Sequence, residues 1–524
     1  MRTTVKKSIK IKFVSVSIAL IMLLLMLPFA SISASANEVS GDCGQNITWI
    51  FDESTGKLTI NGEGAMTFPY GEAPWFNYNH LIHSVVIEEG VTTIANKAFF
   101  SCGELTSVSL PDTLISIGNL AFLACYSLED IAIPDGVTNI GEEAFGSCEK
   151  ITNIDIPYGI VTIENATFSG CASLTSITIP DTVTSIGNNA FSHTALKTID
   201  IPNSITTIGN EAFSGSALTS ITLPDSVKNI GIRAFSDCLQ LTDVELPNNI
   251  TEIKTGTFRF CESLTDISIP DSITVIQGNA FLYCTSLSNI DIPESVTVIG
   301  EHAFESCTSL EKIAVPESVT HIGAVAFANC TSLSEVVLPT EMVDLGDSAF
   351  DGCQKLTKIT LPHGIKRIEN MTFRNCTSLE EIAMTSTVKS IGAQAFSGCS
   401  SLKTLYFEGY LSELNNLSIE EDNNVLASVM VYYMKDPNDD NDNSNTDADD
   451  SDSTGTETDT EFGDWMTNNK NESNGSKGSG KKTPDEDEGS ASDGCGATLT
   501  YGVGIILCSA ILTTATVSKK KENE

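Results

Sequence analysis

The chain has 524 residues, 41% of them hydrophobic, so it is long enough to build one or more packed cores. Its 68 acidic residues outnumber 29 basic residues, and the formal net charge is −39 at pH 7. Because so many carboxylates repel phosphate, the composition argues against binding to nucleic acid or to an anionic membrane surface.

Residues 1–36 have the order of a secretory signal peptide. A basic start precedes an apolar run, and Ala34-Ser35-Ala36 follows as a small-residue cleavage site. The alternative is an N-terminal transmembrane helix, which the polar residues after this site disfavour. Residues 37–80 then alternate apolar and polar side chains around Trp49 and Trp75, and we expect them to form an N-terminal cap for the repeats that follow.

A repeat of about 23 residues occupies residues 81–407. Within one copy, L-T-S-I-T-I-P at 174–180, apolar and polar side chains alternate and a proline ends the run, which predicts a half-buried strand. One copy cannot bury its own apolar face, but copies stacked in a parallel sheet can. Phenylalanine marks the register, with steps of 23 residues except for two of 22: Phe99, Phe122, Phe145, Phe168, Phe191, Phe213, Phe235, Phe258, Phe281, Phe304, Phe327, Phe350, Phe373 and Phe396.

The pattern L-x-x-I-x-I-P-x-x-V-x-x-I-G-x-x-A-F-x-x-C resembles the BspA-type leucine-rich repeat. Residues 43–66 are similar to the lead-in that often precedes such repeats in secreted bacterial proteins. The resemblance implies a β-rich solenoid and a place among surface or secreted proteins, some of which are adhesins for host matrix proteins or other cells. Binding partners transfer poorly between repeat proteins, so the resemblance does not name the ligand.

The C-terminal part of the chain predicts a cap, a spacer and an anchor. Residues 408–435 end in an apolar strand-like run and are expected to close the solenoid, and residues 436–496 are rich in Asp, Asn, Ser and Gly, which predicts a disordered acidic spacer. Residues 497–517 carry no charge and would span about 31 Å as a transmembrane helix. The lysines in 518–524 predict a cytoplasmic tail. The alternative is a tail that a processing enzyme removes.

Twelve cysteines share one repeat position, and we expect a column of buried free thiols rather than disulfides or a metal ladder. His80 and His83 are the one close histidine pair and are expected to be surface residues. The segment from Asp436 to Asp447 has oxygen-bearing side chains spaced as in a calcium-binding loop, but it lacks the glycine of such a loop. A solvated linker is therefore the favoured interpretation. Catalytic motifs are absent, so we expect no enzyme, no cofactor and no metal site.

The exposed positions of the strands are the predicted binding face. This row is rich in threonine and acidic side chains and has few of the aromatic or arginine residues that dominate binding energies. Its candidate residues are Thr175, Thr178, Thr198, Asp200, Thr219, Thr222 and Tyr406.

The sequence as a whole predicts an exported protein, anchored at the cell surface by its C-terminal helix, that carries out non-enzymatic adhesion or ligand recognition. Its expected partners are host or bacterial surface proteins or glycans, with the membrane contacted through the anchor and no nucleic acid bound. The alternative is a structural cell-envelope protein without a dedicated ligand. An aromatic or basic patch in three dimensions would favour adhesion, whereas a uniformly acidic face would favour the envelope role.

Overall fold

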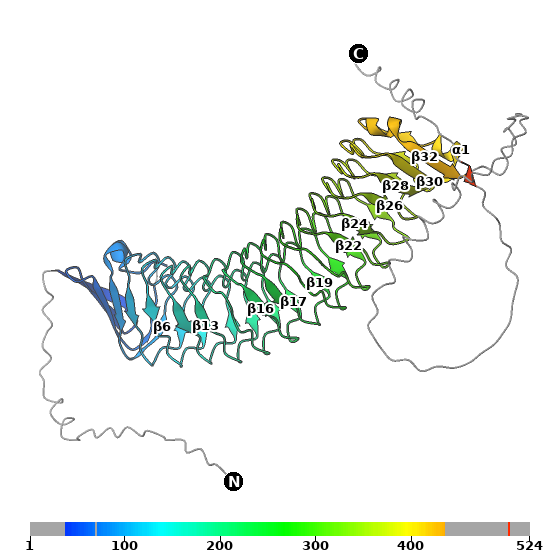
Figure 1. Cartoon of the computed structure of the whole chain (residues 1–524). Coiled ribbons are helices and arrows are strands. Elements are labelled where there is room, and N and C mark those ends of the chain that lie inside the picture. Colours follow the sequence, from blue (N-terminus) through cyan, green and yellow to red (C-terminus); the bar gives the residue numbers. More distant parts are fainter. Residues whose placement is uncertain (1–36, 69–70, 435–500, 503–524) are drawn as a thin grey trace, which may run out of the picture.

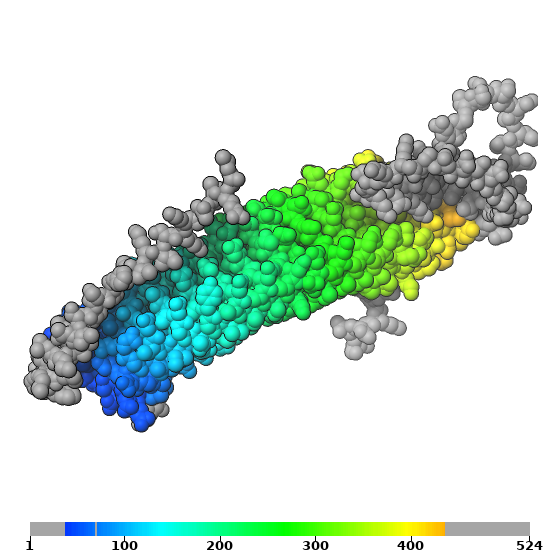
Figure 2. Space-filling model, turned by 90° about the horizontal axis from the view of Figure 1, so that it is seen from below, coloured from blue at the N-terminus to red at the C-terminus, as the bar shows by residue number. Residues whose placement is uncertain are grey.

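The structure, a computed structural model, describes residues 37–68, 71–434 and 501–502. The described chain winds into one curved rod of stacked coils (Figure 1). Its surface follows the sequence in successive bands, as expected where each coil contacts its neighbours along the chain (Figure 2). The predicted signal peptide, spacer and cytoplasmic tail lie outside the described residues.

Each typical coil contributes two short strands to two parallel ladders, which confirms the β-rich solenoid. In the first-strand ladder, β13 pairs with β11 and Ile177 lies opposite Ile154, one repeat apart. Its strands are β5 (Ser84–Ile87), β7 (Ser107–Ser109), β9 (Asp130–Ile131), β11 (Asn153–Asp155), β13 (Ser176–Thr178), β16 (Ser220–Thr222), β18 (Asp243–Glu245), β22 (Lys312–Ala314), β24 (Glu335–Val337), β26 (Lys358–Thr360), β28 (Glu381–Thr385) and β30 (Thr404–Tyr410).

The second-strand ladder keeps its register through the two 22-residue steps, because Ile186 pairs with Ile208 and Ile208 with Ile230. Its strands are β6 (Val91–Ile94), β8 (Ser116–Ile117), β10 (Asn139–Ile140), β12 (Thr162–Ile163), β14 (Ser185–Ile186), β15 (Thr207–Ile208), β17 (Asn229–Ile230), β19 (Glu252–Ile253), β20 (Val275–Ile276), β21 (Val298–Ile299), β23 (His321–Ile322), β25 (Asp344–Leu345), β27 (Arg367–Ile368), β29 (Ser390–Ile391) and β31 (Ser418–Ile419).

The repeat phenylalanines form a continuous buried stack from Phe99 to Phe396. Neighbouring rings lie 5.0 to 5.8 Å apart between centroids, and Trp75 extends the stack at its first end. Offset aromatic stacking adds stability beyond the burial of apolar area. The 23-residue period therefore reflects a ring-on-ring core that each coil renews.

A third ladder, the turn ladder, runs through the segment that carries each phenylalanine. The backbone N–H groups of Lys97, Phe99 and Ser101 donate to carbonyl oxygens of the following coil, at 2.7 to 2.9 Å, and later coils repeat this arrangement. Residues such as Lys97 and Ser101 have φ of 59° and 56°, in the left-handed region. Because all these N–H groups point the same way along the rod, the turn ladder has a direction.

Side chains complete the turn ladder at both ends. The indole Nε1–H of Trp75 donates to the Ala98 carbonyl at 2.7 Å, where a preceding coil would place a backbone N–H. At the other end, Asn423 Oδ1 accepts from the Phe396 N–H at 3.0 Å, where a following coil would place a carbonyl. Each end thus receives the group of the right hydrogen-bonding type.

The first coils are preceded by an antiparallel sheet whose last strand joins the solenoid. Strand β2 pairs with β1 and β3, and β3 pairs in parallel with β5. The bounds are β1 (Glu38–Gly44), β2 (Ile47–Asp52), β3 (Lys57–Gly62), β4 (Gly64–Ala65) and the 3₁₀ helix η3 (Phe76–Leu81). After β30 come α1 (Leu411–Leu414), η4 (Asn424–Ser428) and β32 (Met430–Met434), and β32 extends the sheet beyond β30.

Tyr501 and Gly502 are the described residues of the predicted anchor, 497–517. They form the strand β33 (Tyr501–Gly502), antiparallel to β32, so a continuous helix over this range is not what the structure shows at these two positions. Their backbone pairs with the edge of the sheet instead of with its own helical turns. Across the described ranges, no helix has both the length and the apolar character needed to cross a membrane.

The second-strand ladder is interrupted at three places, between β10 and β12, between β17 and β19, and between β25 and β27. In each case the glycine that usually follows the second strand is replaced, by Glu164, Lys254 or Glu369. Among the phenylalanine pairs of the stack, the rings are also farthest apart here, at 5.8, 5.7 and 5.8 Å for the pairs 145/168, 235/258 and 350/373. We call these three places the joints.

The stacking of the backbone explains the joints. At an ordinary coil a Cβ added to Gly231 would lie 2.3 Å from the Gly209 carbonyl carbon, so a side chain there requires the two coils to separate. At the joints a threonine replaces the alanine before phenylalanine, and its hydroxyl donates to the carbonyl of the residue that replaces glycine, as Thr167 does to Glu164 at 2.9 Å. Gln277 also replaces glycine but keeps its ladder bond to Ile253, one coil after a joint.

Candidate functional site

The predicted binding face lies on the first-strand side of the coils. Thr175, Thr178, Thr198, Asp200 and Thr222 are exposed there, and Thr219 is half-buried. The hydroxyls of Thr175 and Thr219 donate to carbonyl oxygens of the preceding coil, at 3.2 and 3.1 Å. Much of this face therefore offers methyl groups and hydroxyls that the solenoid already uses.

The prediction that Tyr406 belongs to the exposed face is wrong. Tyr406 is only 9% exposed, and its ring stacks on Tyr432 at 5.3 Å between centroids. Strand β32 follows β30 in the sheet and brings Tyr432 onto it, an added strand that the repeat pattern does not contain. The ring of Tyr406 thus packs inside the C-terminal end of the sheet.

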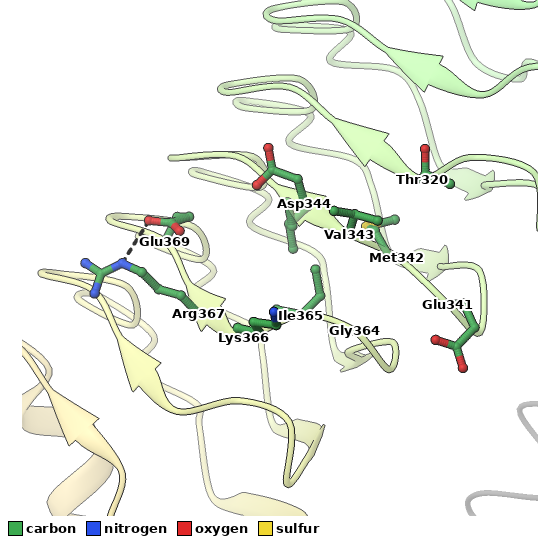
Figure 3. Close-up of a pocket in the computed structure, with 11 residues that line it drawn as sticks. Thr320, Glu341, Met342, Val343, Asp344, Gly364, Ile365, Lys366, Arg367 and Glu369 are labelled. Carbon is green, nitrogen blue, oxygen red and sulfur yellow. Dashed lines mark hydrogen bonds and ion pairs between the residues drawn. The ribbon is translucent and has the colours of Figure 1, made fainter.

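A cavity of about 390 Å³ opens at the third joint, between β25 and β27 (Figure 3). Met342 and Ile365 lie at its inner side, and Asp344, Lys366 and Arg367 stand around it (Figure 3). The cavity is a consequence of the joint, because β25 and β27, which border it, are not paired in the second-strand ladder.

The guanidinium of Arg367, at the edge of this cavity, is already paired with carboxylates. Arg367 contacts the carboxylates of Glu369 and Glu420, both at 2.9 Å. The hydrogen bond to Glu420 is the largest cause that raises the Arg367 pKa, and the same contact lowers the pKa of Glu420. A paired guanidinium is a poor candidate for general acid–base work, so the cavity does not have the character of an active site.

The cysteines of the repeat column are buried free thiols that are not activated as nucleophiles. Its members are buried and unpaired, as in Cys171, whose Sγ–H donates to the Phe145 carbonyl at 3.2 Å. Burial raises the pKa of Cys171 to about 12, so the thiol stays protonated at neutral pH. Over the described ranges, His, Cys, Asp and Glu side chains do not gather into a group that could hold a metal ion.

The turn edge of the solenoid carries a cluster of three residues, the half-buried Arg259 and Phe260 and the exposed Tyr283, which we call the turn-edge cluster. The Arg259 guanidinium carbon lies 4.4 Å from the centre of the Phe260 ring, and the Phe260 and Tyr283 rings stack at 5.0 Å. Cation–π contact and stacking fix the three side chains relative to one another. Arginine and tyrosine are the residue types that most often dominate binding energies.

The turn-edge cluster was not among the predicted site residues, although the spacing of its two rings is visible in the sequence. Phe260 and Tyr283 are separated by 23 residues, one repeat, and therefore occupy the same position in adjacent coils. The binding face predicted from the sequence consisted of exposed strand positions and contained no position of the turn. The discriminating feature named above, an aromatic or basic patch, thus lies on the turn edge and not on the strand face.

The described coils match the model of the BspA type leucine rich repeat region at residues 73–197, 184–311 and 297–425. A leucine-rich repeat protein from Bacteroides ovatus is 25% identical, with 72% of this chain and 98% of that chain covered and a TM-score of 0.43. A leucine rich cell surface protein from Faecalibacterium prausnitzii is 28% identical, with coverage of 72% and 97% and a TM-score of 0.38. The pneumococcal vaccine antigen PcpA is 18% identical, with coverage of 74% and 98% and a TM-score of 0.42. No curated protein matches the chain.

Proposed function

Because the chain belongs to the BspA-type leucine-rich repeat family, we propose that it is a non-enzymatic recognition protein that binds its partner at the cell surface. The family supports surface binding in general, and the partner remains part of the proposal. We include host or bacterial surface proteins and glycans as the partner class.

The turn-edge cluster is the observation that carries this proposal. Tyr283 is 40% exposed, and it stands with Phe260 in a column of turn residues that are otherwise small or polar. Both have φ near 60°, a conformation that costs a residue with a Cβ about 1 to 2 kcal/mol. An exposed ring and a half-buried ring, both kept in a strained backbone conformation, favour a binding role over a purely structural one.

The strand face is the second surface in the proposal. Thr175, Thr178 and Thr198 are exposed along it beside Asp200, and no aromatic ring accompanies them there. Such a face favours weak contacts repeated over a long rod rather than one strong contact. The envelope alternative is favoured by the same acidic, ring-poor surface.

Export and anchoring belong to the proposal as well. The order of basic, apolar and small residues in 1–36 supports secretion, and the uncharged run 497–517 before three lysines supports a membrane anchor. The acidic composition of 436–496 supports a spacer that holds the solenoid away from the membrane.

The proposal is tested by applying the purified protein to an array of host matrix proteins, mucins and bacterial surface glycans. We expect saturable binding to at least one member that persists at physiological salt. A folded sample that binds none of them would shift the assignment to the envelope role. The double variant with Phe260→Gly and Tyr283→Asn separates the two surfaces, because it removes the rings and leaves the strand face intact.

A further inference from the structure

The position that Phe260 and Tyr283 share is one at which every coil adopts a left-handed backbone. Asparagine and glycine suit this conformation, and aromatic residues do not. The other members of the column are Ser101, Ala124, Ser147, Gly170, His193, Gly215, Asp237, Ser306, Asn329, Gly352, Asn375 and Gly398. Two adjacent coils therefore carry an aromatic residue at a position where the other coils do not have a large ring, and the two rings are in contact.

The stack leaves one aromatic face open. Phe260 has Arg259 over its ring and Tyr283 stacked on it. Tyr283 stacks on no second ring within the described residues, and the next residue of the column, Ser306, is small and buried. The 40% exposure of Tyr283 thus includes a ring that a ligand can cover.

The arginine of the cluster is free of carboxylates. Of the four arginines in the described ranges, Arg259 alone lies beyond ion-pair distance of any described Asp or Glu; Arg233, Arg367 and Arg374 pair with Glu211, Glu369 and Asp351 respectively. In a chain with a net charge of −39, an unpaired guanidinium is a local attraction for an external anion.

The stem of Arg233 extends from the preceding coil to the base of Arg259, while its guanidinium pairs with Glu211 at 3.4 Å. A Cβ built on Gly256 would lie 3.0 Å from Arg233 Cγ and 3.7 Å from Arg259 Cβ, so the two arginine stems flank this glycine. Two carboxylates in neighbouring turns have partners of their own: Asp237, on the preceding coil, accepts from the Ser236 hydroxyl, and Glu305 contacts His302 at 2.7 Å. The cluster therefore joins positive charge to an open ring.

We propose that Arg259, Phe260 and Tyr283 form a binding site for an anionic oligosaccharide whose sugars carry carboxylates or sulfates. The C–H face of one sugar would pack on the Tyr283 ring as the positive edge of another ring does. The planar guanidinium of Arg259, which contacts Phe260, would bind the acidic group of a neighbouring sugar through paired hydrogen bonds. This inference rests on the proposed function and names the ligand class of the same site.

The backbone at the cluster disfavours an acidic peptide as the ligand. The N–H groups of Phe260 and Tyr283 donate to the carbonyl oxygens of Leu282 and Glu305, at 2.7 and 2.9 Å. A peptide that added to this edge as a strand would need those groups, and they are occupied. A saccharide needs only the ring face and the guanidinium, both of which are available.

The repeat supplies matched variants for the test. Tyr283→Asn installs the residue found at Asn329 and Asn375, and Arg259→Ser installs the residue found at Ser236 and Ser397. His193→Asn changes the same column in a distant coil and serves as the control. Each variant keeps a side chain that another coil of this chain already accommodates, and thermal melting verifies that it is folded.

The experiment titrates the full-length protein with a uronic-acid oligosaccharide, its carboxyl-reduced counterpart, a sulfated oligosaccharide and poly-glutamate. We expect an acidic saccharide to bind at least tenfold more tightly than the reduced one, with at least a tenfold loss in Tyr283→Asn and Arg259→Ser and no change in His193→Asn. The two acidic probes tell carboxylate from sulfate.

Equal binding of acidic and reduced saccharides, or wild-type affinity in both cluster variants, would overturn the proposal. Binding of poly-glutamate that the same variants abolish, without saccharide binding, would replace it with an acidic protein partner. If no saccharide binds but the array of surface proteins gives a partner, the ligand class is wrong and the recognition function stands.

Discussion

The glycines that directly follow the second strands can be tested at Gly323, and Gly278, which lies one position later in its own coil because Gln277 follows β20, serves as the comparison. A Cβ at Gly323 would lie 2.4 Å from the Glu301 nitrogen and 2.6 Å from the Gly300 carbonyl carbon. At Gly278 the closest atom would be the Glu301 oxygen, at 3.1 Å. Neither glycine has a positive φ, so the contacts, and not the backbone conformation, distinguish the two alanine substitutions.

The expected effect follows from the bonds that the displaced backbone would lose. Gly323→Ala should push two coils apart and break the bond from the Gly323 N–H to the Ile299 carbonyl, now 2.8 Å. Two lost ladder bonds cost about 1 kcal/mol each, and about 0.4 to 1 kcal/mol is recovered because alanine restricts the unfolded chain. We expect a net loss of about 1 to 2 kcal/mol, against a change within about 1 kcal/mol for Gly278→Ala.

Hydrogen exchange measured amide by amide is the appropriate assay, because a repeat protein opens locally rather than in one step. Gly323→Ala should accelerate exchange at Gly323 and at neighbouring second-strand amides, whereas Gly278→Ala should leave its neighbours protected. Chemical denaturation of both variants gives the accompanying loss in stability. If the second-strand amides exchanged equally slowly in both variants, close backbone contact at the glycine would not be the reason that the coils separate at the joints.

Three further predictions concern the C-terminal end of the rod, the buried thiols and the loss of stability at acidic pH. Asn423→Ala should leave the Phe396 N–H without its acceptor and cost about 1 to 3 kcal/mol, seen as faster exchange at Phe396 with no change at Phe281. Cys171 should resist alkylation at pH 8 in the folded protein and react on unfolding; peptide mapping that finds equal rates would contradict its burial. Glu420, whose pKa Arg367 depresses, stabilises the fold above its ordinary pKa, and this contribution is lost as pH falls through the lowered value. The melting temperature of Glu420→Gln should therefore fall less on acidification than that of the wild type.

The repeat made the fold predictable, because the spacing of Phe99 and its equivalents sets the register of every coil. The joints were not predicted, since they depend on how closely the backbone at Gly231 or Gly323 approaches the coil before it, which a pattern of residue types does not show. Tyr406 was misplaced for a related reason: β32 comes after the last repeat and covers it. The pairing of Phe260 with Tyr283 could have been predicted from their separation of one repeat, whereas the contact of Arg259 with the Phe260 ring depends on the turn conformation.

The direction of the turn ladder has a consequence for assembly. A rod of identical coils ends in free N–H groups on one side and free carbonyl groups on the other, so its two ends are complementary. Such ends invite a second copy to continue the ladder head to tail, and a contact of this kind does not close but grows into a filament. The Trp75 indole and the Asn423 amide occupy the two ends, and each gives the last coil the partner that another molecule would otherwise supply. The same two side chains that complete the fold thereby occupy two of the backbone groups through which a second copy could extend the turn ladder.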